Sequence, residues 1–461
     1  MDYQNQESFY NAGFSGWMGV AQKEITPPVQ IYSRNWGAGN DSIKSGIHHP
    51  FFLTCIVFRS EQVGKPLVLV SADLGWWSDA EGEHRFRYAL LEQFNLEEAC
   101  LMISFSHTHS GPNLITENRD KPGGELIEPY LQLLQKQAAA AISEALGQTA
   151  KATLTWSYGH CSLAGNRDQF VAGTTKMFVG FNPAKKADDT LLVGRVCADD
   201  GRHLATIVNY ACHPTSLAWK NKKLSPDYIS AMRNLVQEHT GSICLFLQGA
   251  SGDLAPAEQY SGENELADQY GRWLGYAVMS TLQSMLPPRK QLCFISTVES
   301  GANLAIWEKQ PYEPCSKLEA KIQLVDMKLK PLPTLHEIEQ QWQNCEDPVL
   351  KERLWRQRSI RKSLGNNNPA AVPLWIWRIG ESCFVGHPNE AYSCFQQDLR
   401  QELSPLPIAV MNIVNGHIGY LPPAEMYHYD IYSVWQTPFA PGSLETLTSQ
   451  TIWELKEIMD Y

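Results

Sequence analysis

Short apolar runs that end in a polar, glycine- or histidine-bearing turn recur along the chain. They are LVLVSAD (67–73), ACLMISFSHTH (99–109), LATIVNYACH (204–213), ICLFLQGASGD (243–253) and IAVMNIVNGHIGY (408–420). Near-continuous apolar runs of this length are typical of strands that are buried on both faces. In open α/β sheets, ligands bind beyond the carboxyl ends of such strands, so the polar turns are candidate site segments.

Helical patterns lie between these strands. Leu131, Leu134, Ala138 and Ala141 recur at helical spacing within 128–146. We also expect helices over 227–240, over 263–285 and after Ser78, which with Glu81 has the spacing of a capping box. Alternating strands and helices predict an α/β fold, a three-layer α/β/α sandwich around a mixed, largely parallel sheet.

Residues 334–371 interrupt this alternation with a strongly polar stretch. Thr334 and Glu337 fit a capping box, and Pro348 predicts a break between two exposed helices. We interpret this stretch as a helical insertion within a single catalytic domain, 1–461. It is expected to be a solvated face rather than a partner surface. WIWRIGESCFVG (375–386) predicts a hairpin that turns at Gly380–Glu381.

Composition and charge exclude some partners. Hydrophobic residues make up 43% and charged residues 19%, as in ordinary globular proteins. The net charge of −11 argues against nucleic acid and against an anionic membrane surface. We expect no signal peptide, no integral membrane segment, and no basic amphipathic helix or exposed apolar hairpin for an interface. The 11 scattered cysteines, without a CxxC pair, favour reduced thiols and a cytoplasmic location. Oligomeric state is left open.

Histidines and an acid follow several of the predicted strands. His107 and His109 are two residues apart, so in an extended segment both side chains share a face and can bind one metal, or one can bind while the other moves protons. His213 follows the next strand, and Glu390 can complete a set of two histidines and a carboxylate, with His387 as a competitor. Taken singly, each has an ordinary structural alternative, such as a hydrogen-bonded histidine or a helix-start glutamate.

The turn GASGDLAP (249–256) is rich in glycine. Its backbone N–H groups are candidates to face an oxyanion, and Asp253 is a candidate to orient a histidine. The turn lacks the spacings of nucleotide-binding loops and of the GxSxG nucleophile elbow, so nucleotide binding is excluded and a serine hydrolase is disfavoured, although Ser251 remains a loose candidate.

Taken in order, these segments resemble the neutral (non-lysosomal) ceramidase family. The matching segments are GVAQKEITPP (19–28), SADL (71–74), HTHSGP (107–112), AGNRD (164–168), HPTS (213–216), GDLAP (252–256), PNE (388–390) and GYLPPAEMY (419–427). Each is weak alone, and their joint order carries the resemblance.

The resemblance implies zinc ligands and catalytic roles. The four positions that match the family's zinc ligands are His107, His213, Glu390 and Tyr420. His109 matches a second active-site histidine, which would relay protons. Arg167 matches an arginine that meets the substrate's polar head or carboxylate, and Tyr432 matches a tyrosine that contacts the reacting carbonyl.

Three residues depart from the family pattern, namely Ala255 for a serine, Pro214 for a glycine and Asn389 for a glycine. The chain also stops soon after these segments, so we expect no C-terminal immunoglobulin-like domain. We expect Arg34, Asn35 and Trp36, in the polar segment 34–41, to line the pocket.

The sequence therefore predicts a zinc-dependent hydrolase that uses metal-activated water, cleaving an N-acyl amide bond in a small or amphiphilic substrate. Two alternatives stay open. One is a zinc hydrolase of an ester or a glycoside, and the other is a non-catalytic metal- or ligand-binding protein.

Overall fold

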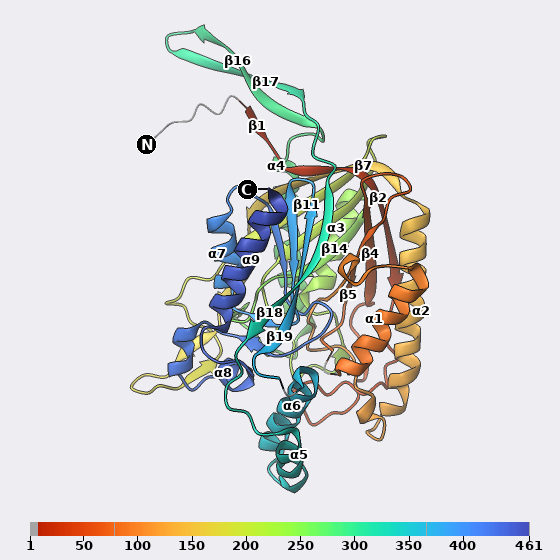
Figure 1. The fold of residues 1–461 in the computed structure, drawn as a ribbon, viewed down its shortest axis with the longest axis vertical. Coiled ribbons are helices and arrows are strands. Elements are labelled where there is room, and N and C mark those ends of the chain that lie inside the picture. Colours follow the sequence, from red (N-terminus) through yellow and green to blue (C-terminus); the bar gives the residue numbers. More distant parts are fainter. Residues whose placement is uncertain (1–7, 78, 366, 461) are drawn as a thin grey trace.

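An eight-stranded mixed sheet lies at the centre of the computed structural model, which describes residues 8–77, 79–365 and 367–460 (Figure 1). Its strand order is β14-β12-β11-β7-β2-β4-β5-β6. The strands are β2 (Gly13–Glu24), β4 (Phe52–Arg59), β5 (Leu67–Ala72), β6 (Leu101–Phe105), β7 (Ala150–His160), β11 (Thr190–Ala198), β12 (His203–Tyr210) and β14 (Ile243–Gln248).

The α/β class and the mixed sheet are confirmed, but the sheet is not largely parallel. Only the two outer pairs, β12–β14 and β5–β6, are parallel, and the pairs between them are antiparallel. The runs that end at His107 and His213 belong to these outer pairs, through β6 and β12. The prediction extended the parallel pairing of the strands that carry site residues to the whole sheet.

A second, four-stranded sheet packs against one face of the first. Its strands are, in order, β18 (Leu318–Met327), β19 (Ala370–Ile379), β20 (Ser382–Gly386) and β22 (Ile408–Met411). Side chains from both sheets, including Leu154, Trp156, Trp377 and Phe384, share one buried core. The tight turn between β19 and β20 falls at Gly380–Glu381, as predicted.

Helices cover the outer faces of both sheets (Figure 1). The central sheet is covered by α1 (Ala80–Phe94), α2 (Ile127–Gly147), α3 (Tyr228–Thr240) and α4 (Asn264–Ser284), and the second sheet by α7 (Cys394–Glu402) and α9 (Ser443–Met459). In α2, a stripe that includes Leu134, Ala138 and Ala141 is fully buried, because these residues share one helix face. The molecule is thus a four-layer α/β/β/α sandwich. The predicted three layers missed the second sheet.

The predicted cap is present at the start of α5 (Leu335–Asn344), whereas α1 is capped by a different residue from the one predicted. Thr334 and Glu337 form the predicted capping box before α5, and Pro348 opens α6 (Pro348–Leu364). Asp79 caps α1 by accepting a hydrogen bond from the Glu81 backbone N–H. The predicted cap, Ser78, lies outside the described residues.

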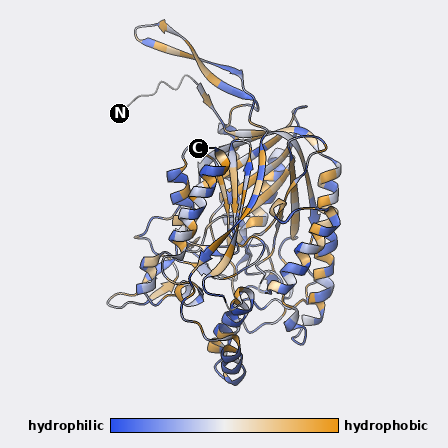
Figure 2. Ribbon diagram, viewed as in Figure 1, coloured by the Kyte–Doolittle hydropathy of each residue, from blue (hydrophilic) through white to orange (hydrophobic). Residues whose placement is uncertain are grey.

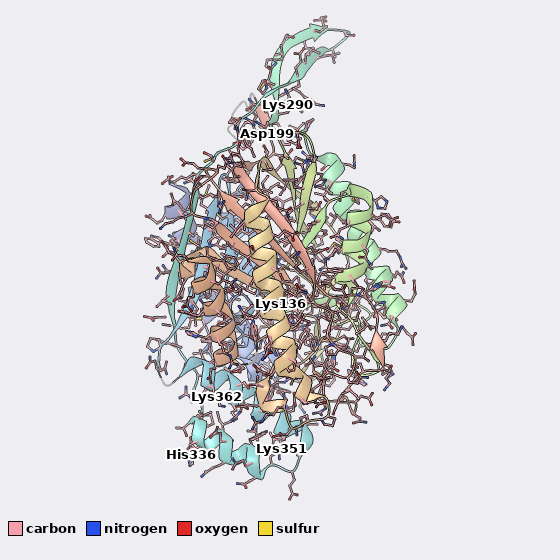
Figure 3. The ribbon with its side chains drawn as sticks, turned by 90° about the vertical axis from the view of Figure 1, so that its right-hand side faces the viewer. Lys136, Asp199, Lys290, His336, Lys351 and Lys362 are labelled. Carbon is pink, nitrogen blue, oxygen red and sulfur yellow. The ribbon has the colours of Figure 1, made fainter. Side chains whose placement is uncertain are left out.

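The helical pair α5 and α6 and a long β-arm extend from opposite ends of the molecule (Figures 1 and 3). The arm consists of β16 (Lys290–Glu299) and β17 (Asn303–Pro311), with β1 (Ser8–Tyr10) paired at its base. Figure 2 shows apolar residues along it, and those exposed include Phe294, Ile295, Val298, Leu304 and Trp307. The expectation that the chain has no exposed apolar hairpin is therefore wrong.

Short elements complete the chain. They are β3 (Gly46–Ile47), β8 (Ala164–Asn166), β9 (Asp168–Phe170), β10 (Met177–Val179), β13 (Lys223–Leu224), β15 (Leu254–Pro256), β21 (Glu390–Ala391), β23 (Tyr420–Leu421), α8 (Tyr432–Gln436) and the 3₁₀ turns η1 (Glu98–Cys100), η2 (Thr116–Asn118), η3 (Gly124–Leu126) and η4 (Ala424–His428). Among the described residues, no helix combines the length and apolar character needed to span a bilayer.

Candidate metal site

Strand ends from different parts of the chain bring four candidate ligands to one edge of the sheets. His107 follows β6, His213 follows β12, and Glu390 and Tyr420 begin β21 and β23. These last two short strands pair in parallel, with Glu390 directly opposite Tyr420. All four side chains are buried.

The ligating atoms of three of these residues converge. The Nε2 atoms of His107 and His213 are 3.1 Å apart. Oε2 of Glu390 lies 3.0 Å from Nε2 of His213 and 3.3 Å from Nε2 of His107. The Tyr420 hydroxyl is 3.4 Å from Nε2 of His213. In a tetrahedral zinc site with bonds of about 2.0–2.1 Å, ligand atoms lie roughly 3.3 Å apart, which is the spacing found here.

The second nitrogen of each histidine shows why this convergence fits a cation. Nδ1 of His107 donates to the Gly75 carbonyl at 3.2 Å, and Nδ1 of His213 donates to the Ser251 carbonyl at 2.6 Å. Because these partners are acceptors, the Nδ1 atoms carry the protons and both Nε2 atoms present lone pairs. Two lone pairs and a carboxylate oxygen therefore face one another, and a cation between them removes their repulsion.

Burial and neighbouring charges set the protonation of this cluster. Burial lowers the pKa of His213 to about 3, and nearby Arg167 acts in the same direction. Burial alone raises the pKa of Glu390, but its close imidazole neighbours, His107 foremost, hold it well below its ordinary value. A neutral histidine beside an ionised carboxylate is the protonation that metal binding requires.

His417 is a site residue that the sequence analysis did not single out. Its Nε2 lies 2.8 Å from Oε1 of Glu390, so it fixes the carboxylate while Oε2 faces the two histidines. The signal was present, because His417 follows the apolar run 408–414 in the same manner as His107 and His213 follow theirs.

We expect His417→Ala to weaken zinc binding about 10–100-fold, since partners that orient a metal ligand typically contribute that much to affinity. The measurement is a zinc competition titration against a chromophoric chelator. His160→Ala is the control, because the His160 side chain is 74% exposed. An unchanged zinc affinity in His417→Ala would remove this role.

Arg167 does not reach the pocket, contrary to the expected contact with substrate. It is buried, and its guanidinium donates to the Gly252 carbonyl and, at 2.9 Å, to the Tyr420 hydroxyl. It therefore holds Tyr420 in place from behind. Arg167 therefore lies next to the candidate ligand Tyr420, as the resemblance implied, but on the side away from the pocket.

Asp253 and its glycine-rich turn also act differently from the prediction. The Asp253 carboxylate accepts hydrogen bonds from Ser393 and Asn166, and among the described residues no histidine bonds to it. The turn's N–H groups at Gly249, Ala250 and Gly252 already donate to other parts of the protein. The site instead depends on two backbone carbonyls of this turn. The Ser251 carbonyl accepts a hydrogen bond from His213 and orients its ring, and the Gly252 carbonyl accepts one from Arg167.

His109 lies beside the cluster with its ring nitrogens free. Both are shielded from solvent and neither bonds to a described residue, although buried polar atoms are usually hydrogen-bonded. Burial, with His107 and His213 adding to it, lowers its pKa well below the ordinary value. The segment is not extended as predicted, since His107 has a φ of 67°, but the rings of His107 and His109 are still only 4.9 Å apart.

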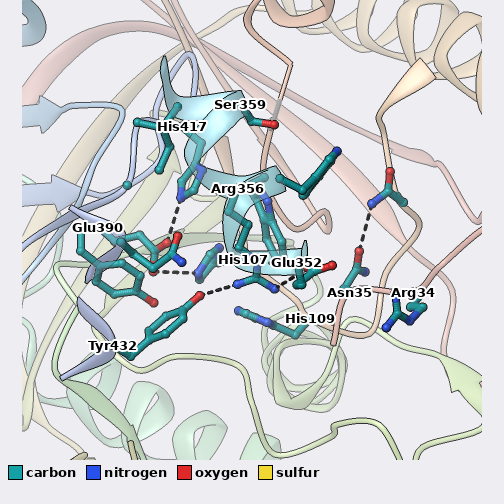
Figure 4. Close-up of a pocket in the computed structure, with 17 residues that line it drawn as sticks. Arg34, Asn35, His107, His109, Glu352, Arg356, Ser359, Glu390, His417 and Tyr432 are labelled. Atoms are coloured by element: carbon teal, nitrogen blue, oxygen red, sulfur yellow. Dashed lines mark hydrogen bonds and ion pairs between the residues drawn. The ribbon is translucent and has the colours of Figure 1, made fainter. Parts of the chain in front are cut away.

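A pocket opens onto this cluster (Figure 4). Its wall includes Arg34 and Asn35 as expected, and Tyr432, whose hydroxyl accepts a hydrogen bond from Arg356. Trp36 is not part of this wall. It packs against His109 instead, with ring centres 5.0 Å apart.

The helical insertion contributes to the same pocket. One face of α6 lines it, with Glu352, Trp355, Arg356, Ser359 and Ile360. The expectation that this insertion is only a solvated face is therefore wrong for α6. A helix with many charged residues is compatible both with a solvated outer face and with a polar pocket wall.

A second histidine cluster elsewhere has a different character. His48 and His49 direct their Nε2 atoms at Oδ1 of Asp268, at 3.3 and 2.9 Å. Here each nitrogen faces a carboxylate oxygen, so ordinary N–H donation satisfies the contacts. In His107 and His213 the Nδ1 atoms already donate to backbone carbonyls, so the neutral rings have no Nε2 proton to donate to Glu390.

The fold and the site together define a class, an α/β/β/α protein with a buried histidine–carboxylate cluster at the sheet edge, which is a candidate metal site. Comparison of the sequence with models of protein families and with curated proteins found no match. Solved structures do match the fold.

A neutral ceramidase from Pseudomonas aeruginosa matches with a TM-score of 0.68 and 15% sequence identity, over 95% of this chain and 73% of that one. A ceramidase complexed with C2 matches with a TM-score of 0.69 and 14% identity, over 95% and 74%. The chain therefore has a ceramidase-like fold, which confirms the resemblance inferred from the ordered motifs.

Proposed function

We propose that the protein is a zinc-dependent hydrolase that cleaves an N-acyl amide bond. The observation that carries the proposal is the convergence of two histidine lone pairs and a carboxylate oxygen within 3.0–3.3 Å at the floor of a pocket. The ceramidase-like fold supports the reaction class. The neutral ceramidase activity named for the similar structures belongs to those proteins, and the bond cleaved here is our inference.

His107, His213 and Glu390 would hold the ion, with Tyr420 beside them. When bound, zinc supplies Lewis acidity, which activates water and polarises a carbonyl. His417 fixes Glu390, and Arg167 fixes Tyr420. Among the polar side chains that line the pocket without serving the ligands, His109 and Tyr432 lie next to the ligand residues.

In this proposal, His109 moves protons. In hydrolysis, the oxygen of water joins the acyl carbon, the C–N bond breaks, and a proton must reach the departing nitrogen. A neutral imidazole with unpartnered nitrogens can accept the proton of water and deliver it to the amine. Trp36 and Trp76 pack on this ring and restrict its movement.

In this proposal, Tyr432 binds the carbonyl oxygen. Arg356 donates to its hydroxyl oxygen, so the phenolic O–H remains available as a donor to the substrate. Burial raises the pKa of Tyr432, which keeps the hydroxyl protonated, although Arg356 opposes this shift. A positioned donor of this kind stabilises the negative charge that develops on the carbonyl oxygen.

The test is to assay zinc-loaded protein on matched amide and ester substrates with the same acyl group, before and after a chelator removes the metal. We expect amide hydrolysis that disappears with chelation and returns when zinc is restored. Cleavage of the ester alone would move the assignment to the ester alternative. Amide hydrolysis that persists without metal would contradict the proposal.

A further inference from the structure

The residues of α6 that line the pocket follow the spacing of a helix. Glu352, Trp355, Arg356, Ser359 and Ile360 are spaced by three and four residues, so they form a single helix face. Figure 4 shows this helix beside the cluster that contains Glu390, His107 and His109. The substrate therefore meets α6 on one side and the candidate metal site on the other.

Contacts on both sides hold α6 across the pocket. On one side, Arg358 and Lys362 each pair at 2.7 Å with Glu117, in the η2 turn. On the other, Arg356 donates to Tyr432 in α8. Ile360 also packs on Gly419, where a Cβ atom would lie only 3.1 Å from it. These contacts hold α6 in place as one wall of the pocket.

The pocket is small. Its cavity volume is about 50 Å³, whereas pockets for drug-sized ligands usually measure about 300–1,000 Å³. A water molecule needs roughly 10–15 Å³ on this scale. A space of this size holds a short acyl group and does not enclose a long alkyl chain.

The pocket is also positively charged apart from the candidate ligands. Arg34 and Arg356 are its two guanidinium groups, and Glu352 is its carboxylate. Arg34 donates to the carbonyls of Gly37 and Gly39 and makes no ion pair with a described residue. Glu352 offsets only one of the two positive charges, through two hydrogen bonds from Arg356.

Arg356 retains capacity to bind a substrate. Nε and Nη2 donate to Oε1 of Glu352 and Nη1 donates to Tyr432, which uses three of its five N–H groups. The remaining two are available to an anion. Because Glu352 and Tyr432 fix the guanidinium, binding an anion there loses little side-chain freedom.

We propose that this pocket selects small N-acyl compounds that carry a carboxylate, such as short-chain N-acyl amino acids, with Arg356 as the specificity-determining residue. The inference rests on the proposed function and names the substrate class of the same site. Size is limited by the wall that α6 forms, and charge is set by Arg356 with Arg34. A two-chain lipid meets neither condition.

Calorimetric binding to zinc-loaded, full-length protein tests this inference without requiring turnover. The probes are N-acetylglycine, its neutral analogue N-acetylglycinamide, and N-dodecanoylglycine. We expect N-acetylglycine to bind at least about tenfold more tightly than either of the others, as loss of a charge-assisted hydrogen bond or of space implies. Equal or tighter binding of the neutral or the long-chain compound would overturn the inference.

A pair of variants on the same helix isolates Arg356. Arg356→Gln should weaken N-acetylglycine binding about tenfold and abolish the preference over the neutral analogue. Lys351→Gln removes the same charge outside the pocket and should preserve both. If the carboxylate binds only at the metal, Arg356→Gln leaves the affinity unchanged, which refutes the role of Arg356.

Turnover of the same compounds separates this inference from the proposed function. Selective binding of N-acetylglycine without hydrolysis of any amide would contradict the proposed function and support the inference. Hydrolysis of the long-chain compound at least as efficiently as of N-acetylglycine would support the function and overturn the inference.

Discussion

His109→Ala should lower kcat for amide hydrolysis roughly 10²–10⁴-fold while zinc stays bound at about one ion per chain. This is the usual contribution of a positioned general acid or base. The His109 ring faces the pocket with both nitrogens unpartnered, whereas Oε2 of Glu390 already contacts Nε2 of His107 and of His213. We therefore assign His109 to proton transfer and Glu390 to the metal.

The measurement combines steady-state kinetics with elemental analysis of the same preparation. His109 also lies close enough to His107 and His213 to be a third histidine ligand, so the two readouts are needed together. Loss of zinc in His109→Ala would make it a ligand and displace this assignment. A loss of less than about tenfold in kcat, with zinc retained, would mean that another group carries the proton. His160→Ala serves as the control.

The largest effect on stability is expected from Asp73→Ala, which should reduce the free energy of unfolding by roughly 3–5 kcal/mol. Asp73 and Arg233 form a buried, two-point ion pair at 2.5 and 2.7 Å, and Asp73 also accepts the Phe52 backbone N–H. Removing the carboxylate leaves a buried guanidinium without its partner, which costs far more than an exposed pair contributes. Urea denaturation followed by tryptophan fluorescence measures the change.

Glu265→Ala is the matched control, because its pair with Arg272 is exposed and contributes little. It should leave the unfolding midpoint unchanged. A decrease below about 1 kcal/mol for Asp73→Ala would show that water or rearrangement satisfies Arg233. The position also bears on the site, since Leu74 and Gly75, which follow Asp73, provide the carbonyls that bind the His107 backbone N–H and Nδ1.

Periodicity and motif order predicted much of the fold and of the candidate site. Apolar runs located β5, β6, β12, β14 and β22, and the rule that ligands bind at strand ends brought His107 and His213 to one edge. Strand pairing was harder, because an apolar run does not encode the direction of its neighbour. The second sheet was missed because the apolar pattern of its strands does not indicate which sheet a strand joins.

The contacts that surround the ligands could not be read from residue types. Backbone carbonyls of Gly75 and Ser251 orient the two histidines, and any residue at those positions carries a carbonyl. Arg167 differs from Arg356 only in the direction in which each side chain points. The polar sequence of α6 fits a solvated helix as well as a pocket wall, and only tertiary packing determines which face meets the substrate.

Zinc content tests the central claim most directly. Wild-type protein from zinc-supplemented expression and a His107→Ala/His213→Ala double variant are purified in parallel and analysed for metal. We predict close to one zinc per chain in the wild type and almost none in the variant, at comparable circular dichroism. Wild-type protein without zinc would contradict the account, because the converging lone pairs of His107, His213 and Glu390 would then have another explanation.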